Sequence, residues 1–529
     1  MIQAKPDAKS KQQPNFLFLV TDQHRADWLG CYGHPVVKTP NLDAIAARGM
    51  RFDNFHVAAP VCMPNRASLM TGRYPTVHGL RYNGCTLPVS ANTFVDVLAT
   101  AGYQTAAIGK SHLQPFTGNQ PMHKRQQAGR LIEEAWQRAP GDYQQEEGER
   151  YGGDNRYPFE TPYYGFNHVD MVTSHGDRCG GHYGQWFRKN VSNWRELHDP
   201  ANELPHTYTC PQAYRTPVPE ELYSTAYIAD RAIDYIGQAK DSEAPFFAFV
   251  SFPDPHHPFN PPGKYWDMYK PEQFDIKLPF SAHQNPTPPM LWMREQWQSN
   301  GDYLTPQTGR MVDDQALREA MALTAGMITC VDDAIGRIIN ALEQHGLDDN
   351  TIICFTADHG DYMGDFNMLL KGAVPLQSIN RVPFLWADPR RSSIGSTPTL
   401  ASTVDIAATV LDRAQLVPYN GMQGRSLGNT LATGAPHRDE LLVEFNDVTA
   451  RLGFEEPARV RSLINERWRY TIYGGLSWGE LYDRQNDPDE THNLWDDPQY
   501  RTIRGELAER LAYQLTDLMD ESPLSERAA

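Results

Sequence analysis

Acidic, amide and imidazole side chains directly follow three short apolar runs in this 529-residue chain. The runs and the segments after them are "FLFLV" (16–20) with "TDQH" (21–24), "FFAFVSF" (246–252) with "PDPHHPF" (253–259), and "TIICFTA" (351–357) with "DHGD" (358–361). Runs this short and rich in aromatic or β-branched residues predict buried strands. Because ligands of open α/β sheets bind beyond the carboxyl ends of the strands, we expect these polar side chains to share one site.

One cysteine stands in a context that the other cysteines lack. In "VCMPNRASLMTGRYP" (61–75), Cys62 lies two residues before Pro64 and four before Arg66, where a helix is expected to begin. A helix N-terminus aims backbone N–H groups at an anion. The seven cysteines are odd in number and scattered, which indicates reduced thiols, and most are expected to be small buried hydrophobes.

Helical patterns lie between the predicted strands. A helix is expected at residues 40–48, with Thr39 as its N-terminal cap. Apolar residues also keep helical spacing within 321–345. Strands that alternate with helices predict an α/β fold, in which a largely parallel sheet is covered by helices on both faces.

Five separated motifs resemble those of the type I sulfatases, the formylglycine-dependent family of the alkaline phosphatase superfamily. "CMPNRASLMTGRYP" (62–75) is similar to the signature whose cysteine, in a C-x-P-x-R context, is oxidised to formylglycine, and "GYQTAAIGKSHL" (102–113) is similar to the second signature. Asp22, the "PHHP" around His256, the "ADHG" at Asp358 and "GELYDRQNDPDETHNLW" fall in the order that the family uses. The resemblance covers most of residues 15–495 and implies the doubly wound α/β sandwich of that superfamily.

The resemblance implies that Cys62 becomes formylglycine (3-oxoalanine), with a formylglycine-generating enzyme as the maturation partner. The aldehyde hydrate carries two hydroxyl groups on one carbon. One attacks the sulfur of a sulfate monoester to give a covalent sulfo-enzyme intermediate, and the other, once deprotonated, expels sulfate. Asn65 stands where the commonest form of the motif has serine, but the C-x-P-x-R core is intact, so conversion of Cys62 is expected.

A divalent cation is needed because a neutral hydroxyl is a weak nucleophile whose pKa must be lowered. The ligands that the resemblance implies are Asp22, Gln23, Cys62, Asp358 and His359. Gln23 replaces the second aspartate usual in the family, and His359 adds a nitrogen donor. Both changes move the site away from an all-oxygen calcium cage. We favour calcium, with manganese as the alternative.

Three cationic side chains match the family positions that stabilise a sulfuryl group in the transition state. Arg66 corresponds to the arginine that holds the aldehyde hydrate and a neighbouring acid. Lys110 and Lys371 correspond to lysines that contact the sulfate, and Lys371 is also expected near the leaving oxygen. Any lone lysine is otherwise a solvated surface charge.

Two histidines and one asparagine complete the implied set. His112 resembles the base that takes a proton to trigger sulfate release, and His256 resembles the residue that protonates or stabilises the departing alcohol. The "P-H-x-P" pattern favours His256 over its neighbour His257. Asn83 is a candidate for hydrogen bonding to substrate oxygens, with a turn asparagine as the alternative.

A glycine-rich segment, "TSHGDRCGGHYGQW" (173–186), brings His175, Asp177 and His182 together in the sequence. A second metal site there is one interpretation, but the spacing matches no known cage. We expect a wall of the substrate pocket, with an ordinary surface loop as the default.

Two alternatives to sulfate ester hydrolysis stay open. A phosphonate monoester or phosphodiester hydrolase of the same superfamily shares formylglycine, and Gln23 and the "DH" at 358–359 resemble that branch. That branch has tyrosine and threonine where Lys110 and His112 stand here, which favours sulfate. If Cys62 is never oxidised, the pocket would be a metal-dependent anion-binding protein without turnover.

Composition limits the partners. The chain has 65 acidic and 48 basic residues, a net charge of −17, which argues against nucleic-acid and anionic-membrane partners but not against a small anionic substrate. The first residues are polar and lack the apolar core of a signal peptide, and no run approaches membrane-spanning length, so we expect a cytoplasmic protein.

The chain divides into three parts by composition. We expect a disordered tail (1–14), a catalytic domain (15–420) with insertions at about 114–220 and 263–312, and a smaller C-terminal subdomain (421–529). That subdomain is predicted to contain short antiparallel strands and a final helix. The helix has an apolar stripe that is expected to be core rather than an oligomer seam, although a homo-oligomer stays open: Ile503, Leu507, Leu511, Leu515 and Leu518.

Overall fold

An eight-stranded sheet forms the centre of the molecule in the computed structural model, which describes residues 13–119, 139–300, 308–391, 395–524 and 527. The strand order is β10-β2-β9-β7-β1-β5-β3-β4, in which β9 runs antiparallel to both neighbours and the other neighbouring pairs are parallel. The strands are β1 (Asn15–Thr21), β2 (Met50–His56), β3 (Gln104–Gly109), β4 (His168–Met171), β5 (Phe246–Phe252), β7 (Thr351–Ala357), β9 (Phe384–Ala387) and β10 (Gly395–Ser402). The mostly parallel α/β architecture expected from the sequence is confirmed.

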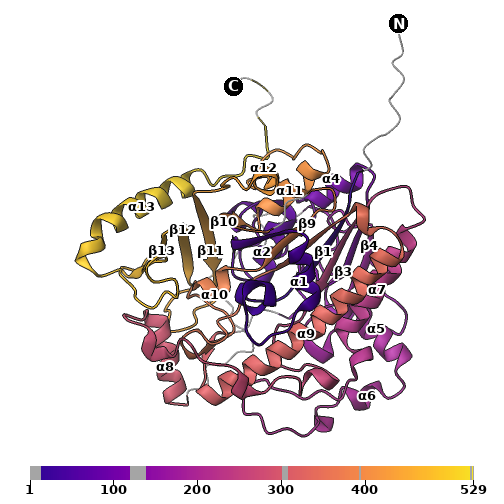
Figure 1. Ribbon diagram of the computed structural model, residues 1–529, viewed down its shortest axis with the longest axis horizontal. Helices are drawn as coiled ribbons and strands as arrows, with labels where there is room; N and C mark the ends of the chain where they lie inside the picture. The colour runs from indigo at the N-terminus through magenta and orange to yellow at the C-terminus, as the bar shows by residue number, and fades with distance from the viewer. Residues whose placement is uncertain (1–12, 120–138, 301–307, 392–394, 525–526, 528–529) are drawn as a thin grey trace, which may run out of the picture.

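Helices cover both faces of this sheet because strand side chains alternate between the faces. The helices of the described residues, not all of which contact this sheet, are α1 (Pro40–Ala47), α2 (Cys62–Thr71), α3 (Pro75–His78), α4 (Phe94–Thr100), α5 (Gly181–Asn190), α6 (Trp194–Leu197), α7 (Ser224–Ala239), α8 (Pro288–Gln298), α9 (Asp314–Gln344), α10 (Gln377–Asn380), α11 (Asp405–Arg413), α12 (Gly428–Thr433) and α13 (Arg501–Thr516). In β1, Leu17 and Leu19 pack with α1, α5, α7 and α9, whereas Phe16 and Phe18 pack with α2, α4 and α11. Figure 1 shows α7 and α9 together on one side of the sheet, with α4 and α11 on the other.

The two helices expected near the strands are present, with adjusted ends. The expected helix at 40–48 is α1, which ends at Ala47. The pattern at 321–345 belongs to α9, which begins earlier, at Asp314, because the Asp313 side chain accepts a hydrogen bond from the backbone N–H of Ala316 (2.8 Å).

The three strands predicted from the apolar runs lie side by side at the centre of the sheet. β1 pairs in parallel with β7 on one side and with β5 on the other. At its carboxyl end Thr21 is level with Ala357 of β7 and with Phe252 of β5. The polar segments after these strands therefore leave the same edge of the sheet, as predicted.

A smaller antiparallel sheet lies beside the large one near the C-terminus (Figure 1). It consists of β11 (Glu440–Asn446), β12 (Arg459–Asn465), β13 (Trp468–Tyr473) and β14 (Gly479–Asp483), and α13 packs against it. Of the leucine stripe in α13, Leu507 and Leu511 are buried, whereas Leu515 is 36% exposed. The expected strands and final helix are confirmed, and the buried part of the stripe is core.

The segments expected to be insertions do more than form loops. Residues 114–220 contribute the edge strand β4 and the helix α5, which packs on the large sheet. Residues 263–312 include α8 and the short strand β6 (Arg310–Met311), which pairs with β8 (Met368–Leu369). The expected tail lies almost wholly outside the described residues, and the domain boundaries stay predictions. Among the described helices, none is long and apolar enough to cross a bilayer.

Candidate active site

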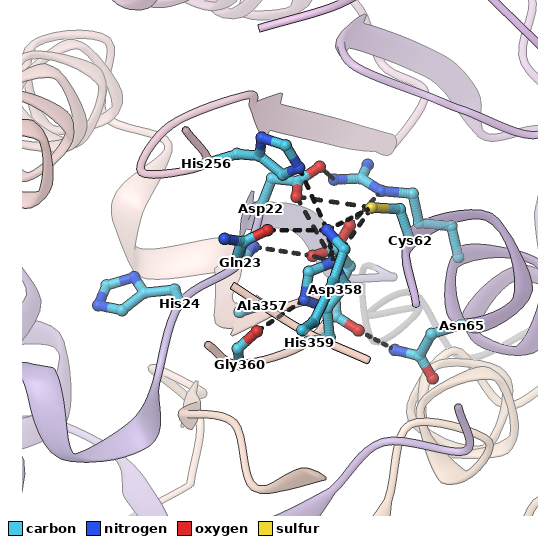
Figure 2. A network of polar contacts seen from close by, with 12 residues as sticks. Asp22, Gln23, His24, Cys62, Asn65, His256, Ala357, Asp358, His359 and Gly360 are labelled. Atoms are coloured by element: carbon cyan, nitrogen blue, oxygen red, sulfur yellow. Dashed lines mark hydrogen bonds and ion pairs between the residues drawn. The ribbon is translucent and has the colours of Figure 1, made fainter. Parts of the chain in front are cut away.

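Cys62 is the first residue of α2, and its thiol is buried beside the carboxyl ends of β1 and β7 (Figure 2). Its Sγ lies 3.1 Å from Nε2 of His359, 3.4 Å from Nζ of Lys371 and 3.8 Å from Oδ1 of Asp22. Burial and the charge of Asp22 act to raise the pKa of the thiol, but Lys371, His359 and Lys110 outweigh them and the pKa is lowered. The thiol thus sits in a pocket that favours negative charge at this position.

Arg66, one turn further along α2, joins the two strand-end carboxylates. Its Nε donates to Oδ2 of Asp358 (2.7 Å) and its Nη2 to Oδ2 of Asp22 (3.3 Å). Its Nη1 donates to the carbonyl of Lys110 (2.7 Å) and to Oγ of Ser251 (2.9 Å) at the end of β5. The fully buried guanidinium therefore fixes the orientation of both acids relative to α2.

Four potential metal-ligand atoms converge at the site, and one of them is Sγ of Cys62. One atom each of Asp22, Cys62, Asp358 and His359 lie within 4.8 Å of one another. Nδ1 of His359 donates to the carbonyl of Gly360 (2.8 Å), which leaves the Nε2 lone pair directed at the other three groups. Two carboxylates, an imidazole nitrogen and residue 62 form a donor set that fits a divalent cation.

Gln23, the fifth implied ligand, adopts a left-handed backbone conformation (φ 60°) that is uncommon for this residue type. Its N–H donates to Oδ1 of Asp358 (3.1 Å), and its side-chain Nε2 donates to Oδ2 of Asp361. These two bonds turn Oε1 towards the site, where it accepts from Nζ of Lys371 (2.8 Å). Asp361 is the last residue of the "DHGD" motif, and its position shortly after a predicted strand is the sequence signal that could have identified it as a site residue.

The two lysines implied by the resemblance both reach the site. Nζ of Lys371 lies 3.0 Å from Nε2 of His359 and 3.1 Å from Nε2 of His256, in addition to its contacts with Gln23 and Cys62. The ammonium group of Lys371 is thus surrounded by acceptor atoms of Gln23, Cys62, His256 and His359, and these atoms already accommodate one positive charge. Nζ of Lys110 forms a buried ion pair with Oδ2 of Asp22. Lys110 and Arg66 hold the pKa of Asp22 well below its ordinary value, although burial alone would raise it.

His112 lies at the edge of the cluster on a loop with a left-handed backbone (φ 58°). Its ring stacks on Phe116 with centroids 3.9 Å apart, and its Nδ1 is buried without a hydrogen-bond partner among the described residues. Burial first, and then the charge of Lys110, lower its pKa well below the ordinary value, so the ring is neutral. No described side-chain contact joins the ring to Cys62.

The carboxylate of Glu146 holds this loop in place. It accepts from the backbone N–H groups of His112 (2.8 Å), Leu113 (2.9 Å) and Gln114 (3.0 Å). It also accepts from the hydroxyl of Tyr163, and it is completely buried. Sequence reasoning missed Glu146 because it lies in a polar segment in which no motif distinguishes it.

His256 lies in the site, and its tautomer is defined by a backbone contact. Its Nδ1 donates to the carbonyl of His257 (2.6 Å), so the Nε2 that faces Lys371 is an acceptor. His257 instead contacts Gln23, with its Nδ1 3.3 Å from Nε2 of the amide. The preference for His256 stays a prediction.

The histidines of the glycine-rich segment 173–186 separate in space. His175 joins the site, where its Nε2 lies 2.7 Å from Nζ of Lys110. Asp177 accepts from Thr216 instead, and His182 bonds to the backbone of Met171. Among the described residues, His175, Asp177 and His182 do not form a metal-type cluster together. The interpretation as a pocket wall stays a prediction for His175.

Two asparagines support α2. Oδ1 of Asn83 accepts from the backbone N–H of Met63 (3.1 Å), so this side chain caps the start of the helix. Oδ1 of Asn65 accepts from Ala58 (3.0 Å) and Thr403 (2.7 Å), while its Nδ2 donates to the carbonyl of Asp358 (2.7 Å). Asn65, which stands where the motif commonly has serine, is thus fixed by three buried hydrogen bonds.

Comparisons with known proteins agree with this arrangement. The sequence pattern of the family described as "Sulfatase" matches residues 14–416, and that of "N-sulphoglucosamine sulphohydrolase, C-terminal" matches residues 369–517. An arylsulfatase of Clostridium perfringens is 28% identical over 495 residues, which cover 92% of this chain and 92% of that protein. The multifunctional alkaline phosphatase superfamily protein PehA of Trinickia caryophylli is 27% identical over 534 residues, with 95% of each chain covered. The phosphonate monoester hydrolase of Agrobacterium radiobacter has a similar structure, with a TM-score of 0.74, 26% identity and coverage of 97% of this chain and 98% of that one.

A mostly parallel sheet with acids, lysines and a helix-borne cysteine beyond its central strands defines an enzyme of the alkaline phosphatase superfamily. Because the family pattern spans most of the chain, the protein belongs to the sulfatase family and is a sulfuric ester hydrolase. The family generally implies a divalent metal and formylglycine, and its substrates are small-molecule sulfate esters.

Proposed function

We propose that this enzyme hydrolyses a sulfate monoester, with residue 62 as the nucleophile after oxidation of its thiol to a formylglycine hydrate. The observation that carries the proposal is the position of Cys62, buried at the start of α2 with Sγ 3.1–3.8 Å from His359, Lys371 and Asp22. A carboxylate, an imidazole and an ammonium group meet at this one atom, as nucleophilic attack on an anionic ester requires.

The residues around Cys62 fit a divalent cation. Asp22, Gln23, Asp358 and His359 would hold it together with residue 62, and when bound it would lower the pKa of the nucleophilic hydroxyl. Arg66 keeps Asp22 and Asp358 in place through its bonds to both. Calcium is favoured, with manganese as the alternative because Gln23 and His359 reduce the hard, anionic character of the site.

The remaining side chains act on the substrate. Lys110 and Lys371 bring two positive charges to the sulfate oxygens, which is a sensible match for a singly charged ester. His256 presents Nε2 next to Lys371, where the departing alcohol is expected. The neutral ring of His112, with a buried and unpartnered Nδ1 among the described residues, can accept the proton whose removal triggers sulfate release.

A phosphonate monoester or phosphodiester hydrolase is the second candidate. Its support is the likeness to the Agrobacterium radiobacter phosphonate monoester hydrolase and to PehA, together with Gln23 and His359 as metal ligands. Lys110 and His112, which resemble the sulfatase pattern, favour sulfate. The pairing of Lys110 with both Asp22 and His175 adds a reason to treat this lysine as part of the site.

Turnover of nitrophenyl sulfate and of phenyl phosphonate nitrophenyl ester by the same preparation tests the choice. The mass of the Cys62 peptide is measured first, because conversion of thiol to aldehyde changes it. We expect faster hydrolysis of the sulfate, and a loss of at least ~10³-fold in Cys62→Ser with the fold retained. A large preference for the phosphonate would overturn the assignment. Full activity with an unmodified thiol would overturn the formylglycine mechanism.

Metal removal gives an independent test. Exhaustive chelation is expected to abolish turnover, and calcium or manganese added back separately should identify the ion by the recovered rate. Elemental analysis of the purified enzyme provides the matching stoichiometry. Unchanged activity after complete removal of divalent ions would contradict the role given to Asp22, Asp358 and His359.

A further inference from the structure

Two imidazole rings are stacked face to face in the site. The rings of His175 and His256 have centroids 3.6 Å apart and planes within 9° of parallel. The ring of His256 also lies close to the ring of His257, with centroids 3.9 Å apart and planes 28° from parallel. His256 thus contacts two other imidazole rings, one of which comes from a distant part of the chain.

His175 also contacts a lysine of the site. Its Nε2 lies 2.7 Å from Nζ of Lys110, just as Nε2 of His256 lies 3.1 Å from Nζ of Lys371. An ammonium group can only donate, so both Nε2 atoms are acceptors and both rings are neutral. The stacked pair therefore orients two cations.

A buried hydrogen bond fastens the loop that carries His175 to the loop that carries His256. Asn260, four residues after His256, donates from Nδ2 to Oδ1 of Asp177 (2.9 Å). Oδ1 of Asn260 accepts from the hydroxyl of Tyr223 (3.1 Å). Gly176 adopts φ +68° and lies so close to Asn260 that a Cβ would be 2.9 Å from its side chain. Since Asn260 is completely buried and Asp177 almost so, the stacked geometry is built into the fold.

We propose that His175 is a positioning residue of this active site, which holds Lys110 through its ring nitrogen and His256 through its ring face. The proposal rests on the proposed function for the roles of these two partners. His256 acts on the leaving group and Lys110 on the sulfate, so the two contacts of His175 serve different parts of the substrate. Separate substitutions can therefore remove one contact at a time.

Two substitutions separate the contacts. His175→Gln keeps an oxygen acceptor for Lys110 but loses the ring, whereas His175→Phe keeps the ring but loses the acceptor. Both are compared with wild type on aryl sulfates whose phenols span a range of leaving-group pKa. We expect His175→Gln to lose up to ~100-fold in kcat on poor leaving groups and little on good ones. A displaced His256 would no longer orient Lys371, whose ammonium group donates to Nε2 of His256 and can supply the proton that a poor leaving group needs. We expect His175→Phe to raise KM on all substrates alike.

The matched control is His206→Gln, which removes a histidine that also contacts an aromatic ring, Trp266 at 5.2 Å, but makes no described contact with the site. Its activity should equal that of wild type across the series. Thermal midpoints and formylglycine content are measured for every variant. Equal losses on all substrates in both His175 variants, or no loss in either, would overturn the positioning role. If wild type prefers phosphonates, the proposed function fails separately, and the same leaving-group series is run with aryl phosphonate esters.

Discussion

Asp22, Asp358 and His359 form a strand-end side of the site that the sheet itself holds, whereas His112 and His175 form a loop side that buried side chains hold. Asp22 directly follows Thr21, the last residue of β1, and Asp358 directly follows Ala357, the last residue of β7. Thr21 and Ala357 pair with each other in the sheet. His112 lies three residues beyond the end of β3, and His175 lies four beyond the end of β4.

Residues at the strand ends and residues on the loops are held by different kinds of hydrogen bond. On the strand-end side the ladder continues past the strands, since N–H of Asp358 donates to Thr21 (3.1 Å) and N–H of His24 donates to His359 (2.8 Å). On the loop side one carboxylate, Glu146, takes the place of a neighbouring strand for residues 112–114. A single substitution at Glu146 should therefore displace residues 112–114 of the loop side. The strand-end side should be displaced only when the charges of Asp22 and Asp358 are no longer balanced.

The largest effect is expected from Arg66→Lys, which attacks that charge balance. A lysine can pair with only one of Asp22 and Asp358, and breaking a buried ion pair leaves an uncompensated charge that costs about 3–5 kcal/mol. We expect a loss of ~10³-fold or more in kcat/KM, a lower metal content and a lower thermal midpoint. Turnover of nitrophenyl sulfate and elemental analysis measure the first two.

Arg73→Lys is the matched control, because Arg73 follows the same helix but bonds to the backbone carbonyls of Gly421 and Asn420. It should lower stability with little change in activity. If Arg66→Lys kept full metal content and activity within tenfold of wild type, the strand-end side would not depend on this guanidinium.

A smaller effect is expected from Glu146→Gln on the loop side. The amide has one acceptor oxygen and would turn its NH₂ group towards backbone N–H donors, so the loop that carries His112 should shift. We expect kcat to fall by ~10- to 100-fold with KM little changed. Because His112 is assigned to sulfate release, the variant should also produce a burst of nitrophenol before the steady state.

Glu149→Gln, an exposed acid three residues away, is the control and should behave as wild type. A stopped-flow trace without a burst, combined with an unchanged kcat, would show that the clamp formed by Glu146 has no part in turnover.

The strand-end side could be predicted from the sequence because its physical signals are local. An apolar run predicts a strand, and the next residue must leave the sheet edge, so Asp22 and Asp358 were placed together without any knowledge of the loops. The structure then shows Phe16 and Leu17 on opposite faces of the sheet, a detail that the uninterrupted apolar run did not indicate. The resemblance then supplied the roles of Cys62 and its partners, which spacing alone did not.

The loop side could not be predicted in the same way, because its contacts join residues with no shared pattern. Glu146 acts on residues more than thirty positions earlier, and His175 stacks on His256 across 81 positions. The glycine-rich segment indicated His175 as a candidate site residue, but it indicated His182 equally, and the ring of His182 forms hydrogen bonds only with the backbone of Met171 and Tyr157 among the contacts described. Only tertiary packing distinguishes two histidines in one motif.

The smallest effect is expected from that second histidine, through pH. Nδ1 of His182 accepts from the backbone N–H of Met171 (3.0 Å), and Nε2 donates to the carbonyl of Tyr157 (3.1 Å), so the folded protein needs the neutral ring at the point where the loop side leaves β4. Burial, and then the charge of Arg156, lower its pKa from 6.5 to about 4. Since the folded-state pKa lies below the unfolded one, this stability is complete above pH 6.5 and is lost as the pH falls towards 4, which amounts to about 2 kcal/mol between pH 7 and pH 5.

The variant His182→Asn keeps an acceptor for Met171 but does not titrate. We expect it to be less stable than wild type at pH 7, because a smaller side chain leaves a void, and to lose less stability on going to pH 5. Thermal midpoints at pH 5, 6 and 7 for wild type, His182→Asn and the variant His206→Gln, whose half-buried ring contacts Glu203, measure the slopes. Parallel slopes for wild type and His182→Asn would mean that acid weakens the loop side through other groups, and the contrast with the strand-end side would then rest on Glu146 and His175 alone.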